Sequence, residues 1–154
     1  MLILGVDPGG VVGWCLVEAP LILRGSGQIK ASEFRASALL TGLGPQDELV
    51  IESFRLRPSK GKSQGGSDMV TPQIIGALQE QAQTQGIPVI YQEPSIKHAM
   101  TGDLLRALGL WPKTGHHSQD AARHVGYRVL TQWAEDPAVV VRLREYVGEI
   151  ASGG

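Results

Sequence analysis

Residues 1–10 read MLILGVDPGG, and the expected fold is built outward from this stretch. An apolar run that ends in a carboxylate and is closed by Pro-Gly predicts a buried strand followed by a tight turn. A buried carboxylate is unfavourable unless another group pairs with it, and a divalent metal ion is a partner that also supports chemistry. Asp7 therefore raises the question of whether the rest of the chain provides further metal ligands.

Length and composition set the broad class of the protein. The chain has 154 residues and a net charge of −1, so it is long enough for one domain with its own core and does not have the overall charge of a nucleic-acid binder. Its one cysteine, Cys15, excludes a disulfide framework or a cysteine-based zinc site within the chain. There is no basic leader and no apolar run near the roughly 20 residues of a membrane span, so we expect a cytoplasmic protein that does not bind membranes.

The alternation of apolar runs and amphipathic segments predicts one α/β domain over residues 1–154. The expected strands cover residues 2–7, 13–18, about 23–30, 48–52 and 87–91, and the first three form an antiparallel meander. The expected helices cover residues about 32–40, 71–85, 94–100, 103–108, 118–133 and 138–150. Thr71 and Asp103 are the expected caps of two of these helices, and residues of about 56–68 are expected to form a mobile loop.

Two further positions resemble Asp7, because each places a carboxylate at or near the end of an expected strand or helix. Glu52 ends the expected fourth strand, and residues 116–124 read HHSQDAARH. On a helix, His117, Asp120 and His124 share one side, opposite an apolar stripe. Alone this pattern is typical of a solvent-facing helix surface. Together with two strand-end carboxylates it indicates a site where carboxylates, with imidazole as an extra ligand or base, bind hard divalent cations for phosphodiester chemistry.

These motifs resemble those of the RuvC-like Holliday junction resolvases, which belong to the RNase H-like superfamily. The resemblance rests on ILGVDPG at 3–9, LVIE at 49–52 and HSQDAARH at 117–124, and the segment AMTGD at 99–103 makes the phage members most similar. It implies a single RNase H-like nuclease domain. The implied fold is a five-stranded mixed sheet flanked by helices, in which strands 1–3 are antiparallel and strands 4 and 5 run parallel to strand 1.

The resemblance also implies a catalytic and metal-binding set. Asp7, Glu52 and Asp120 match the metal-binding carboxylates of the family, and His117 binds metal directly or acts on water. His116 is the alternative to His117, although a shift of one residue turns it about 100° away on a helix. The implied cofactor is Mg²⁺, with Mn²⁺ as a substitute and two ions in each active site.

The implied activity is symmetric cleavage of four-way DNA junctions by a homodimer in a bacterial cell or a phage-infected host. The helix over 71–85 would carry the dimer interface, although a core role explains its apolar residues Ile74, Ile75 and Leu78 equally well. The basic segment after strand four and several cations near the site would bind DNA, with Phe54 stacking on a base and Lys97 contacting the scissile phosphate. The candidate DNA contacts are Phe54, Arg55, Arg57, Lys60, Lys62, Lys97, Lys113, Arg123 and His124. For each lysine, plain solvent exposure is the competing interpretation, and His124 could instead support a metal ligand.

Three other functions share part of this sequence pattern. Sugar kinases and chaperone ATPases also carry Asp-x-Gly after their first strand, but they need two such domains, for which 154 residues leave no room. An RNase H-like nuclease that acts on RNA or on RNA–DNA hybrid stays open, because the metal chemistry is shared. A catalytically dead module that binds branched DNA is disfavoured, since the intact acidic set would then be an uncompensated cost.

Overall fold

The computed structural model describes residues 1–54 and 69–152, so the expected loop over 56–68 lies outside the described residues. The strands are β1 (Leu2–Asp7), β2 (Val11–Glu18), β3 (Ile22–Lys30), β4 (Glu48–Glu52) and β5 (Val89–Gln92). The helices are the 3₁₀-helix η1 (Ala31–Glu33), α1 (Ala36–Leu39), α2 (Val70–Gln85), α3 (Ile96–Ala99), α4 (Gly102–Ala107), α5 (His116–Gln132) and α6 (Pro137–Ala151). This order of elements follows the expectation from the sequence.

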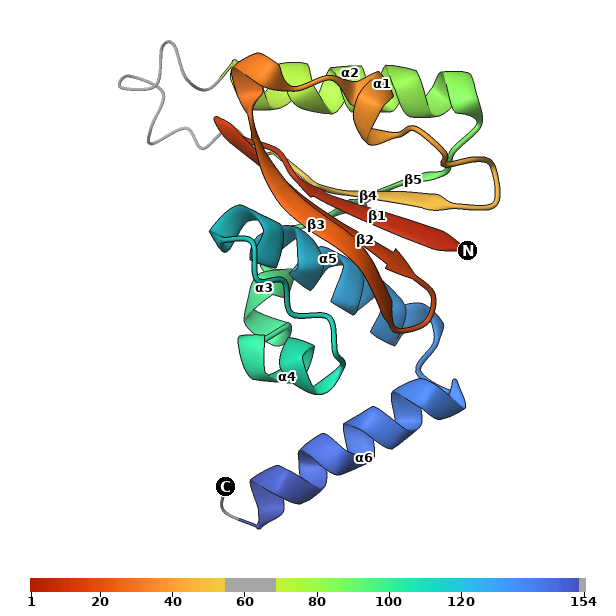
Figure 1. Cartoon of the computed structure of the whole chain (residues 1–154), viewed down its shortest axis with the longest axis vertical. Coiled ribbons are helices and arrows are strands. Elements are labelled where there is room, and N and C mark those ends of the chain that lie inside the picture. Colours follow the sequence, from red (N-terminus) through yellow and green to blue (C-terminus); the bar gives the residue numbers. More distant parts are fainter. Residues whose placement is uncertain (55–68, 153–154) are drawn as a thin grey trace.

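The five strands form one mixed sheet in the order β3-β2-β1-β4-β5 (Figure 1). β1 pairs antiparallel with β2, and β2 pairs antiparallel with β3. β4 runs parallel to β1, and β5 runs parallel to β4. The predicted α/β fold class and sheet topology are therefore confirmed. Because the carboxyl ends of the parallel strands β1, β4 and β5 meet at one edge, Asp7, Glu52 and Gln92 come close together there.

Alternation along each strand decides which side chains face which helical layer. In β1, Ile3 belongs to the core cluster beneath α5, whereas Leu4 and Val6 belong to the cluster beneath α2. Side chains two residues apart share a face of the sheet, so Asp7 lies on the same face as Ile3. In β4, Val50 belongs to the α5 cluster, so the same rule directs Glu52 toward α5. Strand pleating thus aims both carboxylates at one helix.

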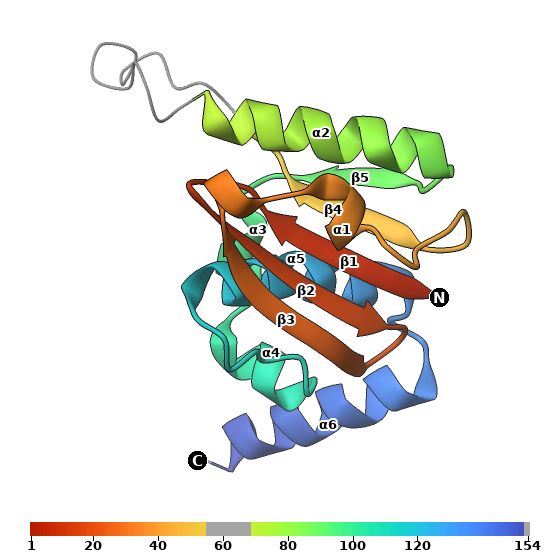
Figure 2. The same cartoon turned by 45° about the horizontal axis from the view of Figure 1, so that its top comes forward.

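Helices cover the two faces of the sheet unequally (Figures 1 and 2). α1 and α2 lie on one side, and α5, with α3 and α4 beside it, lies on the other. On α2, Ile74 and Leu78 are buried against the sheet, so the core role holds for these two of the three side chains considered for a dimer interface. No helix among residues 1–54 and 69–152 is long and apolar enough to cross a membrane.

The structure corrects several predicted helix ends. The helix expected over 32–40 is instead the 3₁₀-turn η1 and the four-residue α1, because the intervening Phe34 and Arg35 have extended backbones. α2 begins at Val70, before Thr71, and has no side-chain cap. The cap of α4 is Thr101, whose hydroxyl accepts from the Leu104 amide at 3.2 Å, and not Asp103, which lies inside the first turn.

Candidate functional site

Three carboxylates from three separate elements converge on one ammonium group. Asp7 ends β1, Glu52 ends β4, and Asp120 lies near the start of α5. The Nζ of Lys97, in α3, lies 2.6 Å from Glu52 Oε2 and 3.0 Å from Asp120 Oδ2. The same Nζ lies 3.5 Å from Asp7 Oδ1. All four side chains are largely buried, so this is a compact acidic site that holds a single cation at its centre.

Burial and pairing act in opposite directions on the pKa values of this cluster. Burial raises the pKa of Asp7, and Lys97 and the hydrogen bond with His117 lower it only in part. Burial also tends to raise the pKa of Glu52, but hydrogen bonds from His124 and Lys97 outweigh it and lower that pKa to about 2. Burial lowers the pKa of Lys97, yet its bonds to the carboxylates raise it overall. Glu52 is therefore a carboxylate and Lys97 an ammonium at neutral pH.

Lys97 places one positive charge among the three carboxylates, and the effect of its removal should be measurable without any substrate. Lys97→Met is expected to lower the free energy of unfolding by roughly 2–4 kcal/mol, somewhat less than the cost of a fully buried broken pair because the Lys97 side chain is 19% exposed. The measurement is urea unfolding in the presence of a chelator. Lys113→Met is the control, because Lys113 is exposed in the loop before α5. Equal stability of the two variants would contradict this role.

Two histidines of helix α5 contact the strand-end carboxylates, and Arg123 forms an ion pair within the helix. His117 Nδ1 lies 2.9 Å from Asp7 Oδ2, and Arg123 Nη1 donates to Asp120 Oδ1 at 3.0 Å. One turn further on, His124 Nε2 lies 2.9 Å from Glu52 Oε2. The side chains that share one helix side in the sequence pattern therefore contact the two strand-end carboxylates. The alternative interpretation of a solvent-facing helix side does not hold at His124, which is completely buried.

The start of α5 is held close to the sheet by small residues and a glutamine. A Cβ placed on Gly13 of β2 would lie only 2.0 Å from the His117 carbonyl oxygen, so only glycine allows this approach. The side chain of Gln28, on β3, accepts a hydrogen bond from the His117 amide at 3.2 Å. Gly115, just before the helix, has φ +98°, which glycine adopts without strain. These contacts set where His117 and Asp120 lie.

The other predicted site residues are placed as follows. Phe54 follows the Glu52 strand end and is 37% exposed, and Lys113 and His116 are exposed. Arg123 is part-buried, and its Nε has no hydrogen-bond partner among the described residues. His124 was predicted as a DNA contact, but it is buried and contacts Glu52 instead of solvent. Four predicted DNA contacts lie outside the described residues: Arg55, Arg57, Lys60 and Lys62.

Gln92 is the polar residue of this region that sequence reasoning missed. It ends β5 beside Glu52, is buried, and its Oε1 lies 2.9 Å from His124 Nδ1. A usable signal was available, because a glutamine at the end of an apolar strand repeats the pattern of Asp7 and Glu52. A neutral amide, however, does not by itself indicate metal ligation.

No group of three or more His, Cys, Asp or Glu side chains in residues 1–54 and 69–152 is arranged so that it could hold a metal ion as the structure stands. In this arrangement the Lys97 ammonium lies among the three carboxylates. The donor chemistry nevertheless fits a hard divalent cation. Three carboxylates already surround a positive charge, and carboxylate oxygens are the ligands that such cations prefer.

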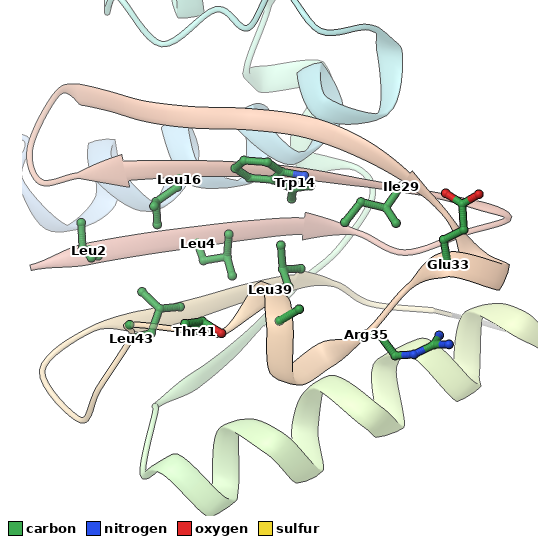
Figure 3. Close-up of a pocket in the computed structure, with 12 residues that line it drawn as sticks. Leu2, Leu4, Trp14, Leu16, Ile29, Glu33, Arg35, Leu39, Thr41 and Leu43 are labelled. Atoms are coloured by element: carbon green, nitrogen blue, oxygen red, sulfur yellow. The ribbon is translucent and has the colours of Figure 1, made fainter.

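A separate apolar pocket of about 550 Å³ lies away from this cluster (Figure 3). Its lining includes Leu4 of β1, Trp14 and Leu16 of β2, and Leu39 of α1. These strand residues face the α2 side of the sheet, whereas Asp7 and Glu52 face α5. The pocket has no carboxylate cluster or imidazole, so the acidic cluster is the better candidate for chemistry.

Comparisons with known proteins find similar proteins among solved structures but not by sequence. No protein-family model matches the sequence, and no match was found among curated proteins. A structure described as T. thermophilus RuvC in complex with Holliday junction substrate matches with a TM-score of 0.63 and 18% identity, over 86% of this chain and 96% of that chain. A second Thermus thermophilus RuvC structure matches with a TM-score of 0.55 and 18% identity, over 87% and 97% of the two chains.

The chain has a RuvC-like, RNase H-like fold. The expectation from the sequence motifs is therefore confirmed for the fold. At 18% identity, the similarity supports the backbone arrangement alone. The case for the acidic cluster as an active site thus rests on the geometry described above, at the carboxyl ends of the parallel strands of this RuvC-like sheet, where open α/β sheets bind their ligands.

Proposed function

We propose that the protein is a metal-dependent, structure-specific DNA endonuclease that resolves four-way junctions by phosphodiester hydrolysis. The observation that carries the proposal is the convergence of Asp7, Glu52 and Asp120, from three separate elements, on one cation at the carboxyl edge of a RuvC-like sheet. Carboxylates held rigidly by strand and helix ends are the groups that divalent-metal nucleases use. The described residues offer no comparable cluster elsewhere for a different chemistry.

The proposed metal ligands are these three carboxylates, with His117 beside them. When bound, Mg²⁺ or Mn²⁺ would supply Lewis acidity toward the scissile phosphate and would make a water more acidic. We propose two such ions in each site. Lys97 must withdraw from the centre of the carboxylates to admit an ion. Its ammonium could then contact a phosphate oxygen, because its stem is anchored in α3 beside the site.

His117 and Arg123 have distinct proposed tasks around the phosphate. The His117 ring is 44% exposed while its Nδ1 is bonded to Asp7, so the ring is fixed in orientation and still open to solvent. This placement suits a group that accepts or delivers a proton at the attacking water. Arg123 pairs with Asp120 through Nη1 and its side chain is 27% exposed, so its guanidinium is the proposed donor to a phosphate oxygen.

Branched DNA is the substrate we favour. The likeness to RuvC structures, one of them described as a complex with a Holliday junction substrate, supports it. We further propose a homodimer in a bacterial or phage-infected cell, because paired active sites would cut the two strands of a junction symmetrically. Phe54 and the basic residues Arg55, Arg57, Lys60 and Lys62 are the proposed DNA contacts that follow β4 in the sequence.

The test compares three labelled substrates, namely a four-way junction, a linear duplex of the same sequence, and an RNA–DNA hybrid. Each is incubated with Mg²⁺, with Mn²⁺, or with a chelator. Paired nicks in the junction alone, lost with the chelator, are the expected result. Cleavage of the hybrid alone would identify an RNase H-like activity instead, and cutting in chelator would overturn the metal-dependent mechanism altogether.

A further inference from the structure

His124 is a fully buried polar side chain whose two ring nitrogens both meet polar partners. Its Nε2 lies 2.9 Å from Glu52 Oε2, and its Nδ1 lies 2.9 Å from Gln92 Oε1. Its exposed fraction is 0%, and that of Gln92 is 8%. Leucine at position 124 would fill the same helix side without burying polar atoms, so a buried histidine and glutamine need a reason beyond packing.

The chemistry of Glu52 fixes the direction of its hydrogen bond with His124. An ionised carboxylate can only accept, so the Nε2 of His124 must carry the proton that is donated to Glu52. The Gln92 oxygen that faces Nδ1 accepts from a protonated Nδ1, and rotation of the amide would instead present its nitrogen as a donor to a bare Nδ1, so Gln92 can pair with either form of the ring. Gln92 therefore holds the imidazole with Nε2–H directed at the carboxylate.

The fold determines that these three side chains meet. Glu52 and Gln92 are register partners at the ends of the parallel strands β4 and β5. His124 lies one helical turn after Asp120 on α5, so it reaches the sheet beside the acidic cluster. The Oε2 of Glu52 accepts from His124 at 2.9 Å and from Lys97 at 2.6 Å. If Lys97 withdraws from the carboxylates, the His124 bond still holds this oxygen.

We propose that His124 and Gln92 are positioning residues that hold the Glu52 carboxylate in the orientation needed to bind the divalent ion. This inference rests on the proposed function, since it assigns Glu52 as a metal ligand. It differs from the expectation for His124 as a DNA contact, because a buried imidazole acts through the carboxylate it orients. Partners of this kind typically change metal affinity 10–100-fold when they are removed.

The test uses the full chain and three variants: His124→Leu, His124→Gln and Gln92→Leu. Calorimetry with Mn²⁺ as the probe gives the ion affinity of each. A ¹H–¹⁵N spectrum of the histidine rings, taken on metal-free protein, gives the tautomer and the exchange of the Nε2 proton. We expect a slowly exchanging Nε2 proton in the unaltered protein, and faster exchange in Gln92→Leu. Mn²⁺ affinity should fall roughly 10–100-fold in His124→Leu and recover in part in His124→Gln, whose amide N–H can reach the carboxylate.

Two results would overturn the positioning role. One is a folded His124→Leu variant that binds Mn²⁺ within twofold of the unaltered protein; if that variant does not fold, Gln92→Leu binding within twofold decides in the same way. The other is a rapidly exchanging Nε2 proton in the unaltered, metal-free protein. A protein whose Mn²⁺ affinity depends on the pair but which cuts no junction would support the positioning role and overturn the nuclease proposal, so the two failures are distinguishable.

Discussion

Asn in place of Asp7 is expected to reduce junction cleavage by roughly 10³-fold or more while leaving the protein folded. The substitution keeps the size of the side chain and removes the negative charge that the proposed ion needs. Asp7 is the carboxylate that both Lys97 and His117 contact, at 3.5 and 2.9 Å. The loss should therefore weaken ion binding and misdirect His117 at the same time.

The fold should tolerate this change, because keeping the buried Asp7 side chain ionised costs free energy of folding. Burial raises the pKa of Asp7, which means that its charged form is disfavoured in the folded protein. Asparagine removes that cost along with the pairing, so the free energy of unfolding should stay within about 1 kcal/mol. Asp103→Asn, at a side chain 80% exposed, is the matched control and should cleave normally. Cleavage by Asp7→Asn within tenfold of the unaltered protein would remove Asp7 from the site.

Alanine at Gly13 is expected to lower the free energy of unfolding by about 3 kcal/mol or more, which corresponds to roughly 6–12 °C in melting temperature. The added Cβ would lie 2.0 Å from the carbonyl oxygen of His117 and 2.1 Å from its carbonyl carbon. Backbone atoms cannot rotate away as the end of a side chain can, so α5 itself must move off β2. Because His117 lies at that contact, cleavage and Mn²⁺ affinity should fall along with stability.

Gly10, in the turn just before β2, provides the control for this substitution. A Cβ at Gly10 has nothing within 4 Å, and its backbone does not lie in the left-handed region. Gly10→Ala should leave stability unchanged or raise it slightly, since alanine restricts the unfolded chain. Thermal melts followed by circular dichroism compare the two variants. If Gly13→Ala melts together with Gly10→Ala, the close packing of α5 on β2 is not what positions the cluster.

Much of the fold could be predicted because its signals are local. The apolar run that ends in Asp7, the run that ends in Glu52, and the motif from His117 to His124 together indicated the RuvC-like arrangement. Alternation along β1 and β4 could also have shown that both carboxylates face the same side. Helix ends were predicted less well, as in the segment of η1 and α1, where two extended residues interrupt the helical turns without any glycine or proline to mark the break.

The sequence by itself determined which residues carry the charge and which side of each element they occupy, because pleating and helical periodicity act over a few residues. Only the tertiary structure decided what those sides meet. The strand order β1-β4-β5 brought Glu52 beside Gln92, and the docking of α5 buried His124 against both. The same packing placed Lys97 at the centre of three carboxylates that lie 23 to 90 residues away in the chain. Such contacts depend on register and helix docking, which no local pattern encodes.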